Sequence, residues 1–81
     1  MRLIKLNTGK YLYIQERSDE RAIDITLYDE NKKNIDGGIL EADIDINTPE
    51  AITECLEFMN VSDLNKLSFN ELDPDEIEDF E

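Results

Sequence analysis

Runs of apolar residues along the chain are short and are separated by turn-forming residues, which is typical of β-strands. Two β-rich runs, at residues 3–6 and 11–15, flank an Asn-Thr-Gly-Lys stretch. A glycine-containing stretch of this kind favours a turn between paired strands. We therefore expect residues 1–17 to form a β-hairpin.

Two further segments alternate apolar and polar residues, which is the period of a strand with one apolar face. The first covers residues 23–28 and follows a polar loop. The second covers residues 40–46, follows the adjacent Gly37 and Gly38, and carries carboxylates between its apolar positions. The alternation predicts a third strand, and then a fourth strand whose outer face is acidic.

A helix is expected over residues 49–59. Thr48 can cap the free amides of the first turn, and the proline that follows it is well tolerated there. The apolar residues of this segment recur at helical spacing and would pack on the sheet. Glu50, Glu54 and Glu57 share the opposite edge of the helix.

Beyond this helix the pattern is less regular. Residues 61–70 fit either a short helix or an edge strand. Residues 71–81 are mostly carboxylates. They fit a last helical turn that docks Ile77 and Phe80, or a disordered tail.

These elements predict the α+β fold class, with a four-stranded, mainly antiparallel sheet packed on one helix. The acidic C-terminal segment is either a short helix or disordered. We expect residues 1–69 to form a single α+β domain and residues 70–81 to form an acidic C-terminal tail.

Charge is distributed unevenly along the chain. The formal net charge is −13, and Lys66 is the single cation of residues 35–81, whereas residues 1–34 are nearly balanced. A large excess of negative charge repels nucleic acid and anionic lipid and attracts basic proteins. The composition therefore favours a basic protein as the partner, without direct binding to nucleic acid or to a membrane.

The candidate chemistry is limited. The chain has no histidine, and its one cysteine, Cys55, lies on the apolar side of the predicted helix without a base to activate it. One cysteine cannot form an internal disulfide, and no Cys or His cluster suits zinc. No run resembles a signal peptide or a membrane span. We expect a cytoplasmic protein that is not an enzyme and uses no cofactor or metal.

A weaker pattern resembles a calcium-binding loop. Asp43, Asp45, Asn47 and Glu54 occupy positions 1, 3, 5 and 12 of a calcium-loop register, where oxygen ligands are needed. Thr48 stands where that loop needs glycine for its sharp turn. A strand that runs into a capped helix explains the same residues better, so a calcium-binding domain is the third choice.

The carboxylates of the acidic half predict a binding surface. Alternate residues of a strand recur about every 6.6 Å, and the phosphates of one DNA strand are ~3.4 Å apart along the helix axis. A carboxylate row extended by the helix and the tail would imitate a phosphate track and occupy the basic groove of a nucleic-acid-binding protein. The alternative is an ordinary solvated surface. The predicted partner-binding residues are Glu41, Asp43, Asp45, Glu50, Glu54, Glu57, Asp73, Asp75, Glu76, Glu78 and Asp79.

The stretch 24–29 and the Asp-Gly-Gly step within residues 35–41 resemble a short domain among the large polyvalent protein-associated domains. These domains are carried by phages and conjugative elements of bacteria, within very large proteins or as small standalone chains. The resemblance covers roughly residues 10–59. It implies a mobile-element origin and an accessory role in a bacterial host cell, and it supplies no catalytic residues.

Charge and resemblance together predict a protein-binding inhibitor from a mobile genetic element that blocks a host nucleic-acid-binding protein or nuclease as a DNA mimic. Small acidic inhibitors of CRISPR effectors and of restriction enzymes are similar in size and charge, which suggests an anti-CRISPR or anti-restriction role and a CRISPR effector nuclease as one partner. The alternative is a generic protein-interaction module of a mobile-element complex that uses Tyr11, Tyr13 and Tyr28.

Overall fold

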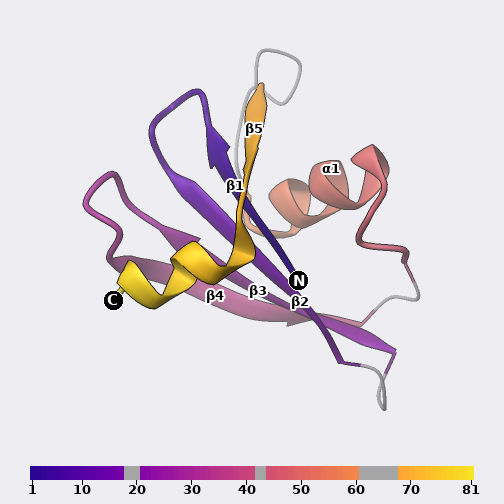
Figure 1. Ribbon diagram of the computed structural model, residues 1–81. Coiled ribbons are helices and arrows are strands. Elements are labelled where there is room, and N and C mark those ends of the chain that lie inside the picture. Colours follow the sequence, from indigo (N-terminus) through magenta and orange to yellow (C-terminus); the bar gives the residue numbers. More distant parts are fainter. Residues whose placement is uncertain (18–20, 42–43, 61–67) are drawn as a thin grey trace.

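The protein folds into one antiparallel sheet with a helix against each of its faces (Figure 1). This computed structural model describes residues 1–17, 21–41, 44–60 and 68–81. Its elements in chain order are β1 (Arg2–Leu6), β2 (Tyr11–Arg17), β3 (Ala22–Tyr28), β4 (Asn34–Leu40), α1 (Pro49–Phe58), β5 (Phe69–Leu72) and the 3-10 helix η2 (Pro74–Asp79).

The predicted α+β class with an antiparallel sheet and one α-helix is confirmed, but the sheet has five strands rather than four. The strand order is β4-β3-β2-β1-β5. The fifth strand, β5, pairs with β1 from Leu3 opposite Leu72 to Leu6 opposite Phe69. The edge-strand alternative for residues 61–70 agrees with β5 at Phe69 and Asn70, but β5 continues to Leu72, into the segment expected to be the tail. A four-residue strand has no clear period of its own, and its partner lies at the other end of the chain, so the local pattern left helix and strand undecided.

The predicted N-terminal hairpin is confirmed by the pairing of β1 with β2. Gly9 in the connecting turn has φ of +96°, a backbone conformation that glycine adopts without steric cost. The Leu6 amide donates to the Lys10 carbonyl at 2.8 Å and closes the turn. Local turn chemistry therefore sets the register of this hairpin.

The predicted fourth strand is displaced along the chain. β4 runs over Asn34–Leu40 and places both Gly37 and Gly38 inside the strand, opposite Thr26 and Ile25 of β3. The prediction of a strand over 40–46 is wrong for the residues described there, because β4 ends at Leu40 and residues 41 and 44–46 are not in a strand. Ile46 lies in the loop before α1, where its side chain is buried in the core beneath that helix and its carbonyl accepts a hydrogen bond from Arg2 Nη1 at 2.6 Å. A buried loop residue, Ile46, thus completed an alternation of apolar and polar residues that is typical of a strand.

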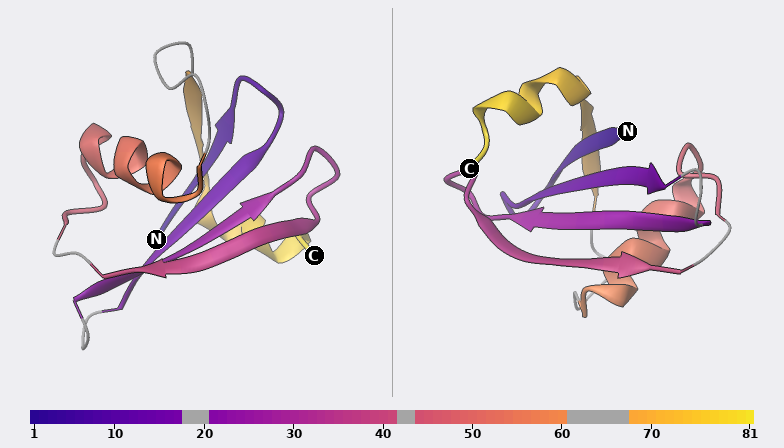
Figure 2. Two further views of the ribbon diagram at one scale, coloured as in Figure 1. Left: turned by 180° about the vertical axis from the view of Figure 1, so that it is seen from behind. Right: turned by 90° about the horizontal axis from the view of Figure 1, so that it is seen from below.

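The sheet carries a core on each face, with α1 over one and η2 over part of the other (Figure 2). The larger core, beneath α1, contains Ile4, Leu6, Leu12, Ile14, Ile23, Ile25, Leu27, Ile46, Ile52, Cys55, Leu56 and Met59. The smaller core, here called the tyrosine core, contains Leu3, Tyr11 and Tyr13, with Tyr28, Leu72, Ile77 and Phe80 packed against it.

The acidic C-terminal segment is ordered as a short helix. Asp73 caps η2 by accepting a hydrogen bond from the Asp75 amide at 3.0 Å, and Glu76 accepts one from the Asp73 amide at 3.2 Å. This reciprocal arrangement is a capping box. Ile77 and Phe80 dock on the tyrosine core, as one of the two sequence-based alternatives expected. Residues 61–67, part of the segment with an ambiguous pattern, lie outside the described residues.

Helix α1 begins at Pro49, as predicted, with Thr48 as its cap. The Ala51 amide donates to Thr48 Oγ1 at 3.3 Å, which satisfies one free amide of the first turn. α1 has ten residues, and none of the described helices is long and apolar enough to span a membrane.

Candidate partner-binding surface

Helix α1 presents three carboxylates to solvent. Its apolar side packs into the larger core, so that Glu50, Glu54 and Glu57 are left exposed on the other side. With a rise of about 1.5 Å per residue, the three carboxylates extend over about 10 Å of the helix. We call these three residues the helix cluster.

The predicted strand-borne row of carboxylates is not formed. Glu41 is exposed just beyond the end of β4, and Asp43 lies outside the described residues. Asp45 is exposed in the loop before α1, where its Oδ1 accepts a hydrogen bond from the Asn47 amide at 2.9 Å. Regular spacing of every second side chain requires an extended strand, so Glu41 and Asp45 do not form a track along the sheet.

The C-terminal segment holds a second group of carboxylates, here called the tail cluster. All of its members are exposed. Two of them, Asp73 and Glu76, use a carboxylate oxygen in the capping box of η2. The tail cluster consists of Asp73, Asp75, Glu76, Glu78 and Asp79.

The fold separates the two clusters. α1 and η2 lie on opposite faces of the sheet, so the sheet stands between the helix cluster and the tail cluster (Figure 2). A single flat partner surface cannot contact both clusters at once. The predicted site residues therefore form two separate acidic patches rather than one continuous surface.

Ion pairs recorded among the described residues use other carboxylates. Arg2 Nε donates to Glu71 Oε1 at 2.8 Å, and Arg17 Nε donates to Asp24 Oδ2 at 2.8 Å. Within the described residues, no member of the helix cluster or the tail cluster takes part in a recorded salt bridge. Both patches thus keep a negative charge that a basic partner could neutralise.

Arg2 is a structural residue that the sequence pattern did not single out. Its Nη1 donates to the carbonyls of Ile46 and Thr48, at 2.6 and 3.1 Å, while Nε and Nη2 both contact Glu71. Arg2 thereby joins β1, β5 and the loop that leads into α1, which holds the helix cluster in place. The only local signal was a cation at the start of a mainly apolar strand.

The tyrosine surface of the alternative hypothesis is largely covered. Tyr11 and Tyr13 are 8% and 7% exposed. Phe80 packs edge-on against Tyr11 and Tyr28, with ring centroids 4.9 Å apart in each pair. Burial, and to a smaller extent Tyr13, raises the pKa of Tyr28. These rings therefore anchor the C-terminal segment and do not form an exposed contact face.

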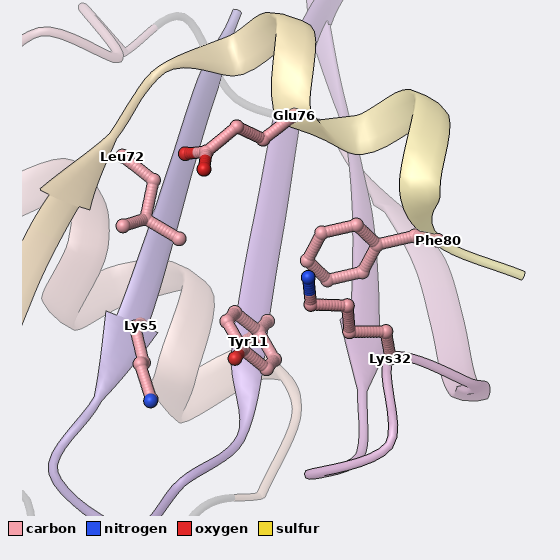
Figure 3. A pocket seen from close by; sticks show the side chains of 6 residues that line it. All are labelled: Lys5, Tyr11, Lys32, Leu72, Glu76 and Phe80. Atoms are coloured by element: carbon pink, nitrogen blue, oxygen red, sulfur yellow. The ribbon is translucent and has the colours of Figure 1, made fainter.

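A small pocket remains beside this contact, between η2 and the strands β1 and β2 (Figure 3). Its volume is about 160 Å³. Lys5 lies 5.6 Å from the Tyr11 ring centroid and Lys32 lies 5.3 Å from that of Phe80, so both cations have an aromatic partner. The lining residues are Lys5, Tyr11, Lys32, Leu72, Glu76 and Phe80.

Cys55 is fully buried on the inner side of α1. Burial, with a contribution from Glu54 and a smaller opposing one from Arg2, raises its pKa to about 11. A thiol with this pKa is almost wholly protonated at neutral pH, and the thiolate is the nucleophilic form. Cys55 therefore acts as a core residue.

The calcium-loop pattern does not form a recognisable loop in the described structure. Asp45 is used in a local turn, and Glu54 lies on the exposed side of α1. Among the described residues, no three His, Cys, Asp or Glu side chains gather in an arrangement that could hold a metal ion.

Comparison with known proteins gives one match. No curated protein and no solved structure matches the chain. A family model described as large polyvalent protein-associated domain 16 matches residues 2–81, which extends well beyond the region where the resemblance was found from the sequence. Since the match covers every described strand and both helices, the chain belongs to the family of large polyvalent protein-associated domain 16.

Proposed function

We propose that this domain is a protein-binding inhibitor from a mobile genetic element that blocks a host nucleic-acid-binding protein or nuclease. Its family is associated with polyvalent proteins of phages, which is consistent with a mobile-element origin. The helix cluster carries the proposal, because its three carboxylates are exposed on a rigid element and have no recorded ion pair among the described residues.

Electrostatics supports a functional reason for this cluster. Like charges at helical spacings of three and four residues destabilise a helix by about 0.2–0.5 kcal/mol per pair. The successive members lie about 6 and 4.5 Å apart along the helix axis, a scale comparable with the phosphate spacing of a nucleic-acid strand. A groove lined with Arg and Lys would neutralise the repulsion, so α1 is suited to compete with nucleic acid for such a groove.

The partner class follows from this chemistry. A basic nucleic-acid-binding protein fits, and a CRISPR effector nuclease or a restriction enzyme would make the domain an anti-CRISPR or anti-restriction inhibitor. Like-charge repulsion argues against direct binding of nucleic acid or of an anionic membrane. We further propose that the domain acts in the bacterial cytoplasm by occupying a site, without catalysis and without a cofactor.

A pair of charge-matched variants tests this proposal. The helix-cluster variant carries Glu50→Gln, Glu54→Gln and Glu57→Gln. The tail-cluster control carries Asp75→Asn, Glu78→Gln and Asp79→Asn, and it spares the capping residues of η2. Each variant loses three negative charges, the first from one face of the sheet and the second from the other. The two variants therefore have the same net charge. Each is used to capture proteins from bacterial lysate, with elution by a salt gradient and displacement by DNA.

The wild-type domain and the tail-cluster control are expected to capture the same basic protein, to release it steeply with salt and to lose it to added DNA. The helix-cluster variant is expected to release it at much lower salt. Equal losses in both variants would contradict a specific role for α1. Capture that ignores both salt and DNA would overturn nucleic-acid mimicry.

A further inference from the structure

Two lysines of this strongly acidic chain line the small pocket between η2 and the sheet (Figure 3). Lys5 belongs to β1 and is exposed, and Lys32 belongs to the turn between β3 and β4 and is half-buried. Neither ammonium group takes part in a salt bridge recorded for the described residues, although the chain carries 21 carboxylates. Glu76 is the one carboxylate of the lining, so the lining as a whole is positive.

Tyr11 adds a hydroxyl group to the same pocket. The residue is 8% exposed, and no hydrogen bond of its hydroxyl is recorded among the described residues. Every fully buried polar side-chain atom in this part of the chain has a partner, so the Tyr11 hydroxyl must reach space that solvent can fill. Buried tyrosines usually find a hydrogen-bond partner. This hydroxyl is therefore available to a molecule that enters the pocket.

The remaining walls limit what can enter. Leu72 and the ring of Phe80 supply apolar surface. Figure 3 shows Glu76 at one end of the pocket and Lys5, with the Tyr11 hydroxyl, at the other. The volume of about 160 Å³ equals that of roughly five water molecules at about 30 Å³ each. The space suits a small molecule, or the last residue of a chain, with one anionic end and an apolar body.

We propose that this pocket binds a carboxylate that is attached to a small apolar body. The ammonium groups of Lys5 and Lys32 would donate charge-assisted hydrogen bonds to the carboxylate oxygens, and the Tyr11 hydroxyl would be a third donor. The apolar body would pack against Leu72 and Phe80. Such an occupant would join β1, the turn between β3 and β4, and η2.

A single negative charge suits this site better than a phosphate dianion. Glu76 at the far end and the net charge of −13 both repel additional negative charge. A free acid and the C-terminal residue of a peptide present the same chemistry. The inference does not use the helix cluster, which lies on the opposite face of the sheet, so it stands independently of the proposed function.

The first test uses the wild-type domain alone. The ligands are benzoate, its neutral analogue benzamide, and acetate, which lacks the apolar body. Each is titrated into the full chain at neutral pH and followed by NMR at the Lys5, Lys32 and Leu72 amides. Benzoate is expected to bind at least about tenfold more tightly than benzamide, as for loss of a charge-assisted hydrogen bond. It should exceed acetate by a similar factor, because acetate buries little apolar surface.

Variants of equal charge then locate the site. Lys5→Met and Lys32→Met each remove one ammonium group and keep an apolar stem, and each is expected to weaken benzoate binding about tenfold. Tyr11→Phe removes only the hydroxyl and should weaken binding about three- to tenfold. Lys10→Met is the control, because Lys10 is exposed and is not part of the lining. It should weaken binding by less than about twofold.

A pair of peptides separates the two sources of the carboxylate. A tetrapeptide that ends in leucine is titrated once with a free C-terminal carboxylate and once as the C-terminal amide. Binding of the acid at the same amides, with a loss of about tenfold for the amide, assigns the pocket to a peptide terminus. Binding of benzoate without the peptide assigns it to a free acid.

The wild-type comparison decides the matter even if a variant fails to fold. Equal binding of benzoate and benzamide, or equal losses in Lys10→Met and Lys5→Met, would overturn the inference. So would shifts that map to another surface, or the absence of saturable shifts with every carboxylate. The Glu81 amide, which donates to the Lys32 carbonyl at 2.9 Å, should exchange more slowly when benzoate is bound.

Discussion

The ring of Phe58 lies so close to Gly38 that a β-carbon on residue 38 would come within 2.7 Å of its Cε1 atom. Gly38 therefore has no side chain because α1 packs its last residue directly onto the backbone of β4. The Asp-Gly-Gly step that carried the family resemblance thus has a structural explanation in the contact between helix and sheet.

Substitution of Gly38 should be coupled to Phe58. We expect Gly38→Ala to lower the free energy of unfolding by about 1 kcal/mol more in the wild type than in a Phe58→Ala background. In the wild type the added methyl group must displace the ring of Phe58. Gly37→Ala is the matched control, because its β-carbon meets the Ile25 carbonyl at an ordinary 3.4 Å. Urea unfolding of the wild type, the two single variants and the double variant measures the coupling. Additive effects of Gly38→Ala and Phe58→Ala on the free energy of unfolding would contradict the contact.

Loss of the Arg2 donors should destabilise the domain. Arg2→Met keeps an apolar stem but leaves the carbonyls of Ile46 and Thr48 without this partner. We expect a loss of about 1–3 kcal/mol in the free energy of unfolding, as for unsatisfied part-buried groups. Lys10→Met, at an exposed position, should change stability by less than about 0.5 kcal/mol. Equal effects of the two substitutions in urea unfolding would argue against the role of Arg2.

Cys55 should make stability fall at high pH. Its pKa is raised from 9.0 to about 11 in the folded protein, so the folded state keeps a proton that the unfolded chain loses. The free energy of unfolding should therefore decrease between about pH 9 and pH 11, by on the order of 2–3 kcal/mol, and should be unaffected by this group below pH 9.

Cys55→Ala is the control for that pH dependence. The substitution lowers stability at every pH by opening space in the core. It should also remove the contribution of the thiol to the dependence of the free energy of unfolding on pH. Tyr28, whose pKa is also raised, contributes in both proteins and cancels in the comparison. Identical slopes for wild type and variant, measured by urea unfolding across this range, would show that the thiol does not contribute.

Phe80 should hold the C-terminal segment on the sheet. Phe80→Ala removes the edge-on contacts to Tyr11 and Tyr28, and we expect a loss of about 1–2 kcal/mol together with faster exchange of the Glu81 amide. That amide donates to the Lys32 carbonyl at 2.9 Å in the wild type. Asp79→Ala, at an exposed neighbour, should change neither property. Unchanged near-ultraviolet circular dichroism of the tyrosines in Phe80→Ala would contradict the anchoring role.

Local interactions were sufficient to predict several elements from the sequence. The hairpin of β1 and β2, the strand β3 and the start of α1 each depend on neighbours within a few residues: a glycine turn, a period of two, and a capping threonine. The uneven distribution of charge also follows directly from the order of the residues. These features needed no knowledge of distant contacts.

Tertiary contacts decided the rest. β5 pairs with the open edge of β1, Gly38 lies under the ring of Phe58, and Ile46 is buried in the core beneath α1 although it lies in a loop. Each depends on residues far apart in the chain, which a periodic pattern does not record. The sequence by itself determined how many carboxylates the acidic half carries. Only the packing of α1 and η2 on opposite faces decided that they form two patches, since the sheet lies between them.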